Sequence, residues 1–173
     1  MKAIRLTIAA VTLSLSSFIA SAQTTAPVLT AYYNVKDALV STDAAKAKTS
    51  AAELVAALGK VNAANLSATD KKAMATAKTK AADISKSNDV DTQREAFEGL
   101  STSMIALAKA TKPAKRMARS GRSAGAVPAP TYVQFCPMAA DGKGASWLSD
   151  KKEVRNPYYG DKMLKCGSVK EEI

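Results

Sequence analysis

Residues 90–107 have the sequence VDTQREAFEGLSTSMIAL, and their apolar positions repeat at the spacing of an α-helix. These positions are Val90, Phe97, Leu100, Met104 and Leu107, which follow one another at steps of three, four or seven residues. Residues at such steps lie on one face of a helix. The stretch therefore predicts an amphipathic helix whose apolar face packs on other helices.

Three further helices are predicted upstream, and alanine is frequent on their apolar faces. Ser41-Thr42-Asp43 and Ser67-Ala68-Thr69-Asp70 offer side chains that can cap helix starts, and Gly59 and Asn88-Asp89 mark helix ends. Four amphipathic helices with short connections predict a mainly α protein, with an alanine-rich antiparallel four-helix bundle over residues 23–112. The three upstream apolar faces consist of Val28, Tyr32, Val35 and Leu39, then Ala47, Ala51, Leu54 and Leu58, then Met74, Ala77, Ala81 and Ile84.

Residues 1–22 have the pattern of a secretory signal peptide. Lys2 and Arg5 precede an apolar run over residues 6–19, and Ala20-Ser21-Ala22 has the form of a cleavage site. The run is short for a membrane span, and no second apolar run follows it. We therefore expect a protein exported to a bacterial periplasm, cleaved near Ala22 and without a membrane span.

The chain is basic, with a formal net charge of +10. The signal segment contains two of the 25 basic residues and none of the 15 acidic ones, which leaves +8. Residues 113–130 form a basic segment rich in proline and glycine, a composition typical of a linker. No aromatic residue is interleaved with its charges, so it lacks the stacking platform of single-strand binders. We expect no nucleic-acid partner.

Residues 131–173 differ in composition from the helical part. They contain both cysteines of the chain and five of the eight aromatic residues that follow the signal segment. Asp141-Gly142 and Asn156-Pro157-Tyr158-Tyr159-Gly160 predict turns. So short a module rarely supplies enough core to fold alone. We therefore expect a small, irregular Cys/Met-containing module that packs on the bundle.

Each cysteine has a methionine nearby, in Cys136-Pro137-Met138 and in Met163-Leu164-Lys165-Cys166. Residues i and i+2 share a face in an extended segment, and residues i and i+3 share a face in a helical turn. The four side chains could therefore form a site of four sulfur atoms, within one chain or across a dimer. Thiolate and thioether ligands select Cu(I), and by the same logic Ag(I). Zinc normally takes cysteine, histidine or carboxylate ligands, and the chain has no histidine.

A disulfide is the alternative for the same two cysteines. Exported proteins often use a cysteine pair as a structural crosslink, and methionine is a common gap-filler in cores. A Cys136–Cys166 bond would staple the module, and the protein would be a non-catalytic structural or interaction domain. In the metal hypothesis, Lys143, Lys162 and Lys165 are expected to favour the thiolate forms at neutral pH.

The sequence favours a protein that is not an enzyme. No histidine is available as a general base, and neither a G-x-S-x-G motif nor a phosphate-binding glycine loop occurs. We therefore predict no catalytic residues and no bound organic cofactor.

The stretch from Tyr132 to Ile173 resembles the C-terminal signature of an uncharacterised family of exported proteins. That signature joins CPM, G-A-x-W-L and N-P-Y-[FY]-G-x-x-M-L-x-C-G, and this chain has CPM, GASWL and NPYYGDKMLKCG in the same order. The stretch YYNVKDALVSTDAAKAKTSAAELVAAL, residues 32–58, is similar to the helical part of the family. Related domains occur as separate exported proteins and at the end of adaptor subunits of Cus-type heavy-metal efflux pumps.

This resemblance implies a role in the handling of copper or silver. The CPM element is also similar to short heavy-metal-binding modules of such systems. The resemblance implies a chaperone, buffer or efflux accessory whose partner is an efflux adaptor or another periplasmic protein. The residues at the matching motif positions are Cys136, Met138, Met163 and Cys166.

Overall fold

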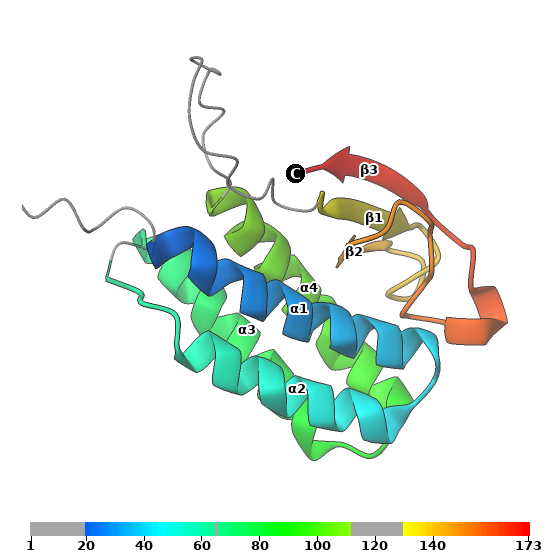
Figure 1. Ribbon diagram of the computed structural model, residues 1–173. Helices are drawn as coiled ribbons and strands as arrows, with labels where there is room; N and C mark the ends of the chain where they lie inside the picture. The colour runs from blue at the N-terminus through cyan, green and yellow to red at the C-terminus, as the bar shows by residue number, and fades with distance from the viewer. Residues whose placement is uncertain (1–19, 65, 112–129) are drawn as a thin grey trace, which may run out of the picture.

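The computed structural model describes residues 20–64, 66–111 and 130–173, which form four helices followed by a small sheet (Figure 1). The mainly helical fold and its bundle packing are as predicted, because each helix packs on the next one along the chain. Most of the predicted signal peptide, and all of the predicted linker except Pro130, lie outside the described residues. The helices are α1 (Ala20–Val40), α2 (Ala44–Gly59), α3 (Ala68–Lys86) and α4 (Val90–Ala110).

Helices α2, α3 and α4 each begin with a side-chain cap. A cap satisfies a backbone donor of the first turn that has no partner within the helix, so the helices can start directly after short connections. The capping side chains of α2, α3 and α4 are those of Asp43, Ser67 and Asp89, which accept from the backbone N–H groups of Lys46, Asp70 and Thr92.

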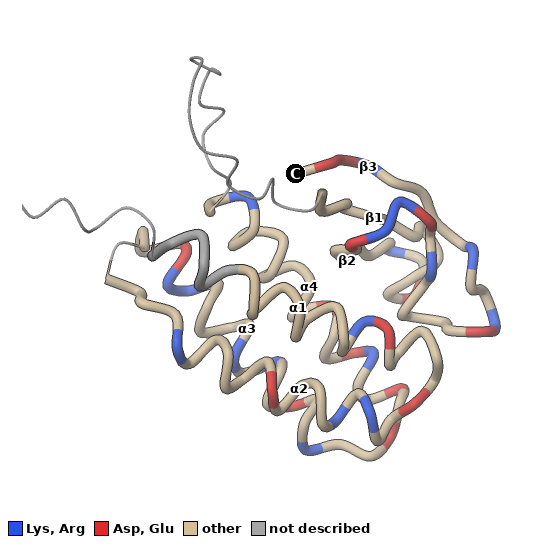
Figure 2. The backbone as a smooth tube through the Cα atoms, viewed as in Figure 1, with Lys and Arg blue, Asp and Glu red and all other residues tan. Residues whose placement is uncertain are grey.

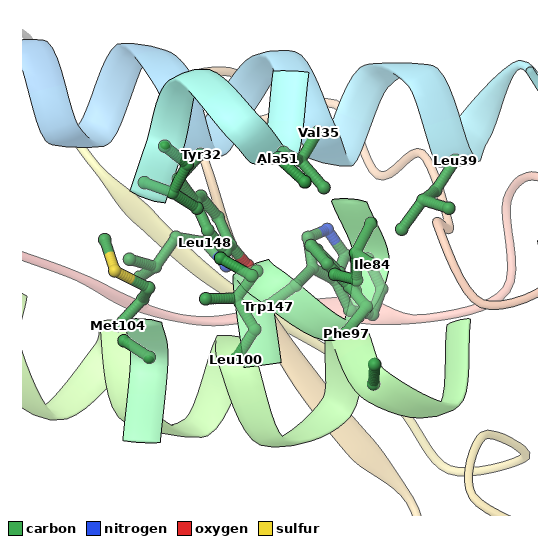
Figure 3. Close-up of a cluster of buried hydrophobic side chains, with 14 of the residues drawn as sticks. Tyr32, Val35, Leu39, Ala51, Ile84, Phe97, Leu100, Met104, Trp147 and Leu148 are labelled. Carbon is green, nitrogen blue, oxygen red and sulfur yellow. The ribbon is translucent and has the colours of Figure 1, made fainter. Parts of the chain in front are cut away.

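The bundle core contains a few large side chains and many alanines. Phe97, Leu100 and Met104 of α4 are at most 2% exposed, so the periodicity of the sequence identified the buried face. Figure 3 shows these side chains meeting those of Tyr32 and Val35 from α1. Small side chains let helix backbones approach closely, and the fully buried alanines are Ala38, Ala47, Ala51, Ala77 and Ala81.

A three-stranded antiparallel sheet follows, where the sequence predicted an irregular module. β1 (Tyr132–Cys136) lies between β2 (Ala145–Ser149) and β3 (Ser168–Glu172), and the short 3-10 helix η1 (Gly160–Met163) precedes β3. The prediction of irregular structure was wrong. The strands were missed because each has only five residues, and β2 is buried at four of its five positions. A strand buried on both faces loses the alternation of apolar and polar residues that identifies strands.

The sheet contacts the bundle through β2, which packs on α4 and on part of α1. Trp147 and Leu148 of β2 are fully buried, and Figure 3 shows them in one cluster with Tyr32 and Phe97. The rings of Tyr32 and Phe97 stack with centroids 5.5 Å apart. The sheet and the bundle therefore share a single apolar core.

Two buried cations connect the bundle to the chain that follows β2. The Lys36 side chain, 3% exposed, lies 2.9 Å from Asp37 and 3.3 Å from Asp150, measured from Nζ to carboxylate oxygen. The Nε of Arg94 donates to the carbonyl of Pro157 at 3.1 Å. Burying a cation is costly unless it is paired and hydrogen-bonded, so these partners tie the segment after β2 to α1 and α4.

Acidic and basic residues are mixed along the described part of the chain. Figure 2 shows acidic and basic residues interspersed along the helices and around the sheet. Among the described residues, no helix is long and apolar enough to cross a membrane.

Candidate metal centre

The structure brings together the two cysteines of the chain. The Sγ atoms of Cys136 and Cys166 lie 2.8 Å apart, and both residues are free thiols. Cys136 ends the central strand β1 and is fully buried, whereas Cys166 follows η1 and is half-buried. The pair therefore has one side in the core and one side open to solvent.

The two methionines of the predicted site lie on the surface. Met138 is 51% exposed and Met163 is 38% exposed, and they are the exposed large apolar residues of the described part. Other methionines of that part, Met74 and Met104, are buried in the bundle. The thioethers therefore belong to the segments that carry the thiols, but they are not buried with them.

The expected strand geometry of Cys136 and Met138 is wrong. β1 ends at Cys136, and Pro137 already belongs to a tight turn that runs to Lys143. Pro137 has no backbone N–H for the strand ladder, which fits the end of pairing at this point. The second segment is closer to expectation, because the N–H of Cys166 donates to the carbonyl of Met163 at 3.0 Å, as in a helical turn.

A glycine lets the second segment approach β1. Gly167, directly after Cys166, has a φ of +136°, and a Cβ at this position would lie 2.7 Å from the carbonyl oxygen of Phe135. Any larger residue would push the Cys166 segment away from the strand that carries Cys136. Gly167 therefore contributes to the short distance between the thiols.

The turn over residues 156–160 holds both segments. From the sequence, its tyrosines, Tyr158 and Tyr159, were expected to shield the site, and Asn156 was assigned no role. Asn156, which is fully buried, donates twice to the backbone around Cys166: its N–H donates to Leu164 O at 2.8 Å and its Nδ2 to Cys166 O at 3.0 Å. The hydroxyl of Tyr159 donates to Met138 O at 2.5 Å. The Asn-Pro turn motif was the signal in the sequence that pointed to this element.

An aromatic wall lies beside the thiols. Tyr158 packs edge-to-face on Trp147, with ring centroids 5.9 Å apart, and its hydroxyl donates to the carbonyl of Ser146 at 2.9 Å. Burial raises the pKa of Tyr158 well above its usual value, and the nearby Cys136 adds to the shift. The phenol therefore stays protonated and serves as a hydrogen-bond donor.

The thiol of Cys166 is harder to ionise than an ordinary thiol. The hydrogen bond with Cys136 and then burial raise its pKa, while the backbone N–H of Met138 acts in the opposite direction. The expectation that nearby lysines favour the thiolate is wrong for this residue. Lys143, Lys162 and Lys165 are exposed, and water screens such charges.

The two potential metal donors that the structure brings into contact are the sulfur atoms of Cys136 and Cys166. Within residues 20–64, 66–111 and 130–173, no group of three or more His, Cys, Asp or Glu side chains is arranged to hold a metal ion. A site for zinc or another ion that needs several nitrogen or carboxylate ligands is therefore not formed by these residues. The residues that could hold a soft ion are Cys136 and Cys166, with Met138 and Met163 as the neighbouring thioethers.

Comparison with known proteins identifies the helical part. The family described as "Protein of unknown function (DUF3347)" matches residues 28–116, just over half of the chain. The match covers the bundle and ends before the sheet and the thiol pair. No curated protein and no solved structure shows a significant match.

Proposed function

The chain belongs to this family of proteins of unknown function, and we propose that it binds a monovalent soft metal ion, Cu(I) or Ag(I), through its thiol pair. The observation that carries the proposal is the convergence of Cys136 and Cys166, 2.8 Å apart between Sγ atoms, at the end of β1. Two thiolates are sufficient for a linear Cu(I) site, and sulfur ligands select this ion over harder metals.

The exposed methionines support the same proposal. Both side chains are exposed to solvent, so filling a gap in the core does not account for their positions. Met138 and Met163 lie within three residues of a thiol, and thioethers are ligands that Cu(I) accepts. We propose that they are additional ligands of the ion or lie at the entrance of the site.

The proposed location and partner rest on the sequence. The N-terminal pattern over residues 1–22 supports export to the periplasm. The resemblance of the C-terminal motifs to those of Cus-type efflux adaptors supports a role as a chaperone, buffer or accessory of heavy-metal efflux. Mass spectrometry of the protein from a periplasmic extract should find an N-terminus at Gln23; an intact Met1 in that fraction would contradict cleavage.

The decisive experiment is a Cu(I) titration of the reduced chain under anaerobic conditions with a competing chromogenic chelator. A count of free thiols precedes the titration. We expect one Cu(I) per chain, lost in Cys136→Ser and weakened in Met138→Leu and Met163→Leu. Met74→Leu, a similar change in the buried face of α3, is the matched control and should bind as the unchanged chain does. A fully reduced chain that binds no Cu(I) would exclude the proposal.

The second candidate is a non-catalytic interaction domain stapled by a Cys136–Cys166 disulfide. The same convergence of the thiols supports it, because oxidation of the pair would close a loop of 30 residues. Such a crosslink contributes roughly 3–4 kcal/mol in the chain-entropy model. The test compares the melting temperatures of the oxidised chain and Cys136→Ser without metal. Equal melting temperatures would exclude the staple.

A further inference from the structure

The turn Asn156–Gly160 contains no sulfur, yet it contacts both segments that carry the thiols. We propose that this turn is the positioning element of the thiol site, with Asn156 and the Tyr159 hydroxyl as its positioning groups. The inference rests on the proposed function only in that the pair which they position is the proposed metal site.

On the Cys166 side, Asn156 uses every polar group it has. Its backbone N–H and side-chain Nδ2 hold Leu164 and Cys166, as described above. Its Oδ1 accepts from the N–H of Tyr158 at 2.8 Å, and its carbonyl accepts from the N–H of Gly160 at 3.0 Å. A fully buried side chain with all of these bonds has one allowed orientation, so the Cys166 carbonyl is fixed relative to the turn.

On the Cys136 side, the Tyr159 hydroxyl fixes the backbone of Met138. The carbonyl of Met138 accepts from Tyr159 at 2.5 Å and also from the N–H of Gly142 at 3.3 Å. The N–H of Met138 in turn forms a hydrogen bond with the Cys166 sulfur, which by itself lowers the pKa of that thiol. One bond from Tyr159 therefore orients a residue that lies two positions after Cys136 and whose backbone N–H reaches the Cys166 thiol.

The turn is itself anchored on the bundle. Arg94 of α4 donates to the carbonyl of Pro157 at 3.1 Å and to the hydroxyl of Thr42 at 3.1 Å. A Cβ on Gly160, whose φ is +57°, would lie 2.6 Å from the Thr42 hydroxyl and 2.7 Å from Arg94. This close fit means that the connection between α1 and α2, and not the sheet alone, sets the position of the two segments that contain Cys136 and Cys166.

The physical role of such a device is pre-organisation. Two thiols held near each other have a high effective concentration, and a metal ion or an oxidant that needs both of them gains from it. Removal of one positioning hydrogen bond should lower this effective concentration while the fold is retained. For an exposed hydrogen bond such as that from Tyr159 to Met138, the expected loss is about two- to fivefold.

The effective concentration can be measured without any metal. The reduced chain is equilibrated with oxidised and reduced glutathione; the Cys136–Cys166 bond forms as the glutathione disulfide breaks, and two glutathione thiols take up the protons. The constant of this exchange is compared for the unchanged chain, Tyr159→Phe and Tyr132→Phe. Tyr132 is the matched control, because its hydroxyl forms no hydrogen bond with the described residues. Thermal melting verifies that each variant is folded.

We expect the exchange constant to fall about two- to fivefold in Tyr159→Phe and to stay unchanged in Tyr132→Phe. The Cu(I) affinity should fall by a similar factor in Tyr159→Phe alone. An unchanged constant in Tyr159→Phe, or an equal fall in both variants, would overturn the inference. If the unchanged chain binds no Cu(I), the proposed function fails, and the glutathione exchange still decides whether Tyr159 positions the thiols.

Discussion

The hydroxyl of Tyr32, in the middle of α1, accepts a hydrogen bond from the backbone N–H of Leu148 in β2 at 3.2 Å, across 116 residues of sequence. The same hydroxyl lies 2.7 Å from the Ser101 hydroxyl of α4. β2 is an edge strand of the sheet, and its outward N–H needs a partner when it is buried. Tyr32 thus joins two helices and the sheet edge through one oxygen atom.

Replacement of Tyr32 by phenylalanine should destabilise the protein by about 1–3 kcal/mol, because it leaves the buried Leu148 N–H without a partner. The ring is retained, so its stacking on Phe97 is preserved. The measurement is the free energy of unfolding in urea. Tyr132→Phe, a half-buried tyrosine of β1, is the control and should change it by less than about 0.5 kcal/mol. Equal effects of the two changes would contradict the assigned role of Tyr32.

Replacement of Arg94 by lysine should cost about 1–3 kcal/mol, because one ammonium cannot replace the separate guanidinium bonds. Arg94 donates to the carbonyls of Pro157 and Leu39 and to the Thr42 hydroxyl. Its ion pair with Asp91, a largely exposed residue, contributes little by comparison. Asp91→Asn is therefore the control, and urea unfolding should show a small effect for it. A larger loss in Asp91→Asn than in Arg94→Lys would show that the ion pair dominates.

Two glycine-to-alanine changes should act in opposite directions. Gly160→Ala forces a Cβ into Thr42 and Arg94 at a left-handed φ, and should destabilise the protein by at least about 2 kcal/mol. Gly59→Ala, at the end of α2, meets no atom within 4 Å and should stabilise it by about 0.5–1 kcal/mol. Thermal melting of both variants tests the pair. A neutral Gly160→Ala would mean that the turn can move away from the bundle without cost.

The raised pKa of Cys166 predicts a slow reaction with iodoacetamide at neutral pH. The thiolate is the reactive form, so the alkylation rate should still be rising with pH above the ordinary thiol pKa of 9.0, where the rate for an unshifted thiol levels off. The Cys136 thiol is the leading cause of the shift, and Cys136→Ala should therefore accelerate the reaction of Cys166 at pH 8. The unfolded chain in urea is the reference for an unshifted cysteine. A slower reaction in Cys136→Ala would contradict the stated cause.

The same shift has a consequence for the stability of the reduced, metal-free chain. A group whose pKa is higher in the folded state than in the unfolded state favours folding while it is protonated. For Cys166 this contribution is present below pH 9.0 and is lost as the pH rises through the folded pKa. The urea midpoint of the reduced chain should therefore fall in this alkaline range, and it should fall less in Cys166→Ser.

The helices could be predicted from the sequence because their signal is repeated many times. In α4 the apolar spacing continues over five turns, and Asp43 and Ser67 lie in the predicted capping stretches and cap α2 and α3. Asp89, which the sequence indicated only as a helix end, also caps α4. The strands could not be predicted in this way, because five residues give too few positions for a period. The burial of β2 on both sides removed even the short alternation that remained.

The thiol pair was foreseeable from composition, but its surroundings were not. Two cysteines near methionines suggest either a metal site or a crosslink, and the structure places the two sulfurs together. The exposure of Met138 depends on the turn that begins at Pro137, and the hold on Cys166 depends on Asn156, ten residues away. Such contacts between segments leave no periodic trace in the sequence.

The wide separation of the contacts between bundle and sheet has a consequence for the order of folding. The most extensive helix contacts join helices that are neighbours along the chain, whereas Tyr32 with Leu148 and Lys36 with Ser149 close loops of more than 100 residues. Closing such loops costs entropy that local contacts do not. We expect the helices to assemble early and the strands to dock late. The two thiols would then stay accessible to cellular oxidases and metal donors throughout that interval, before β1 withdraws Cys136 from solvent.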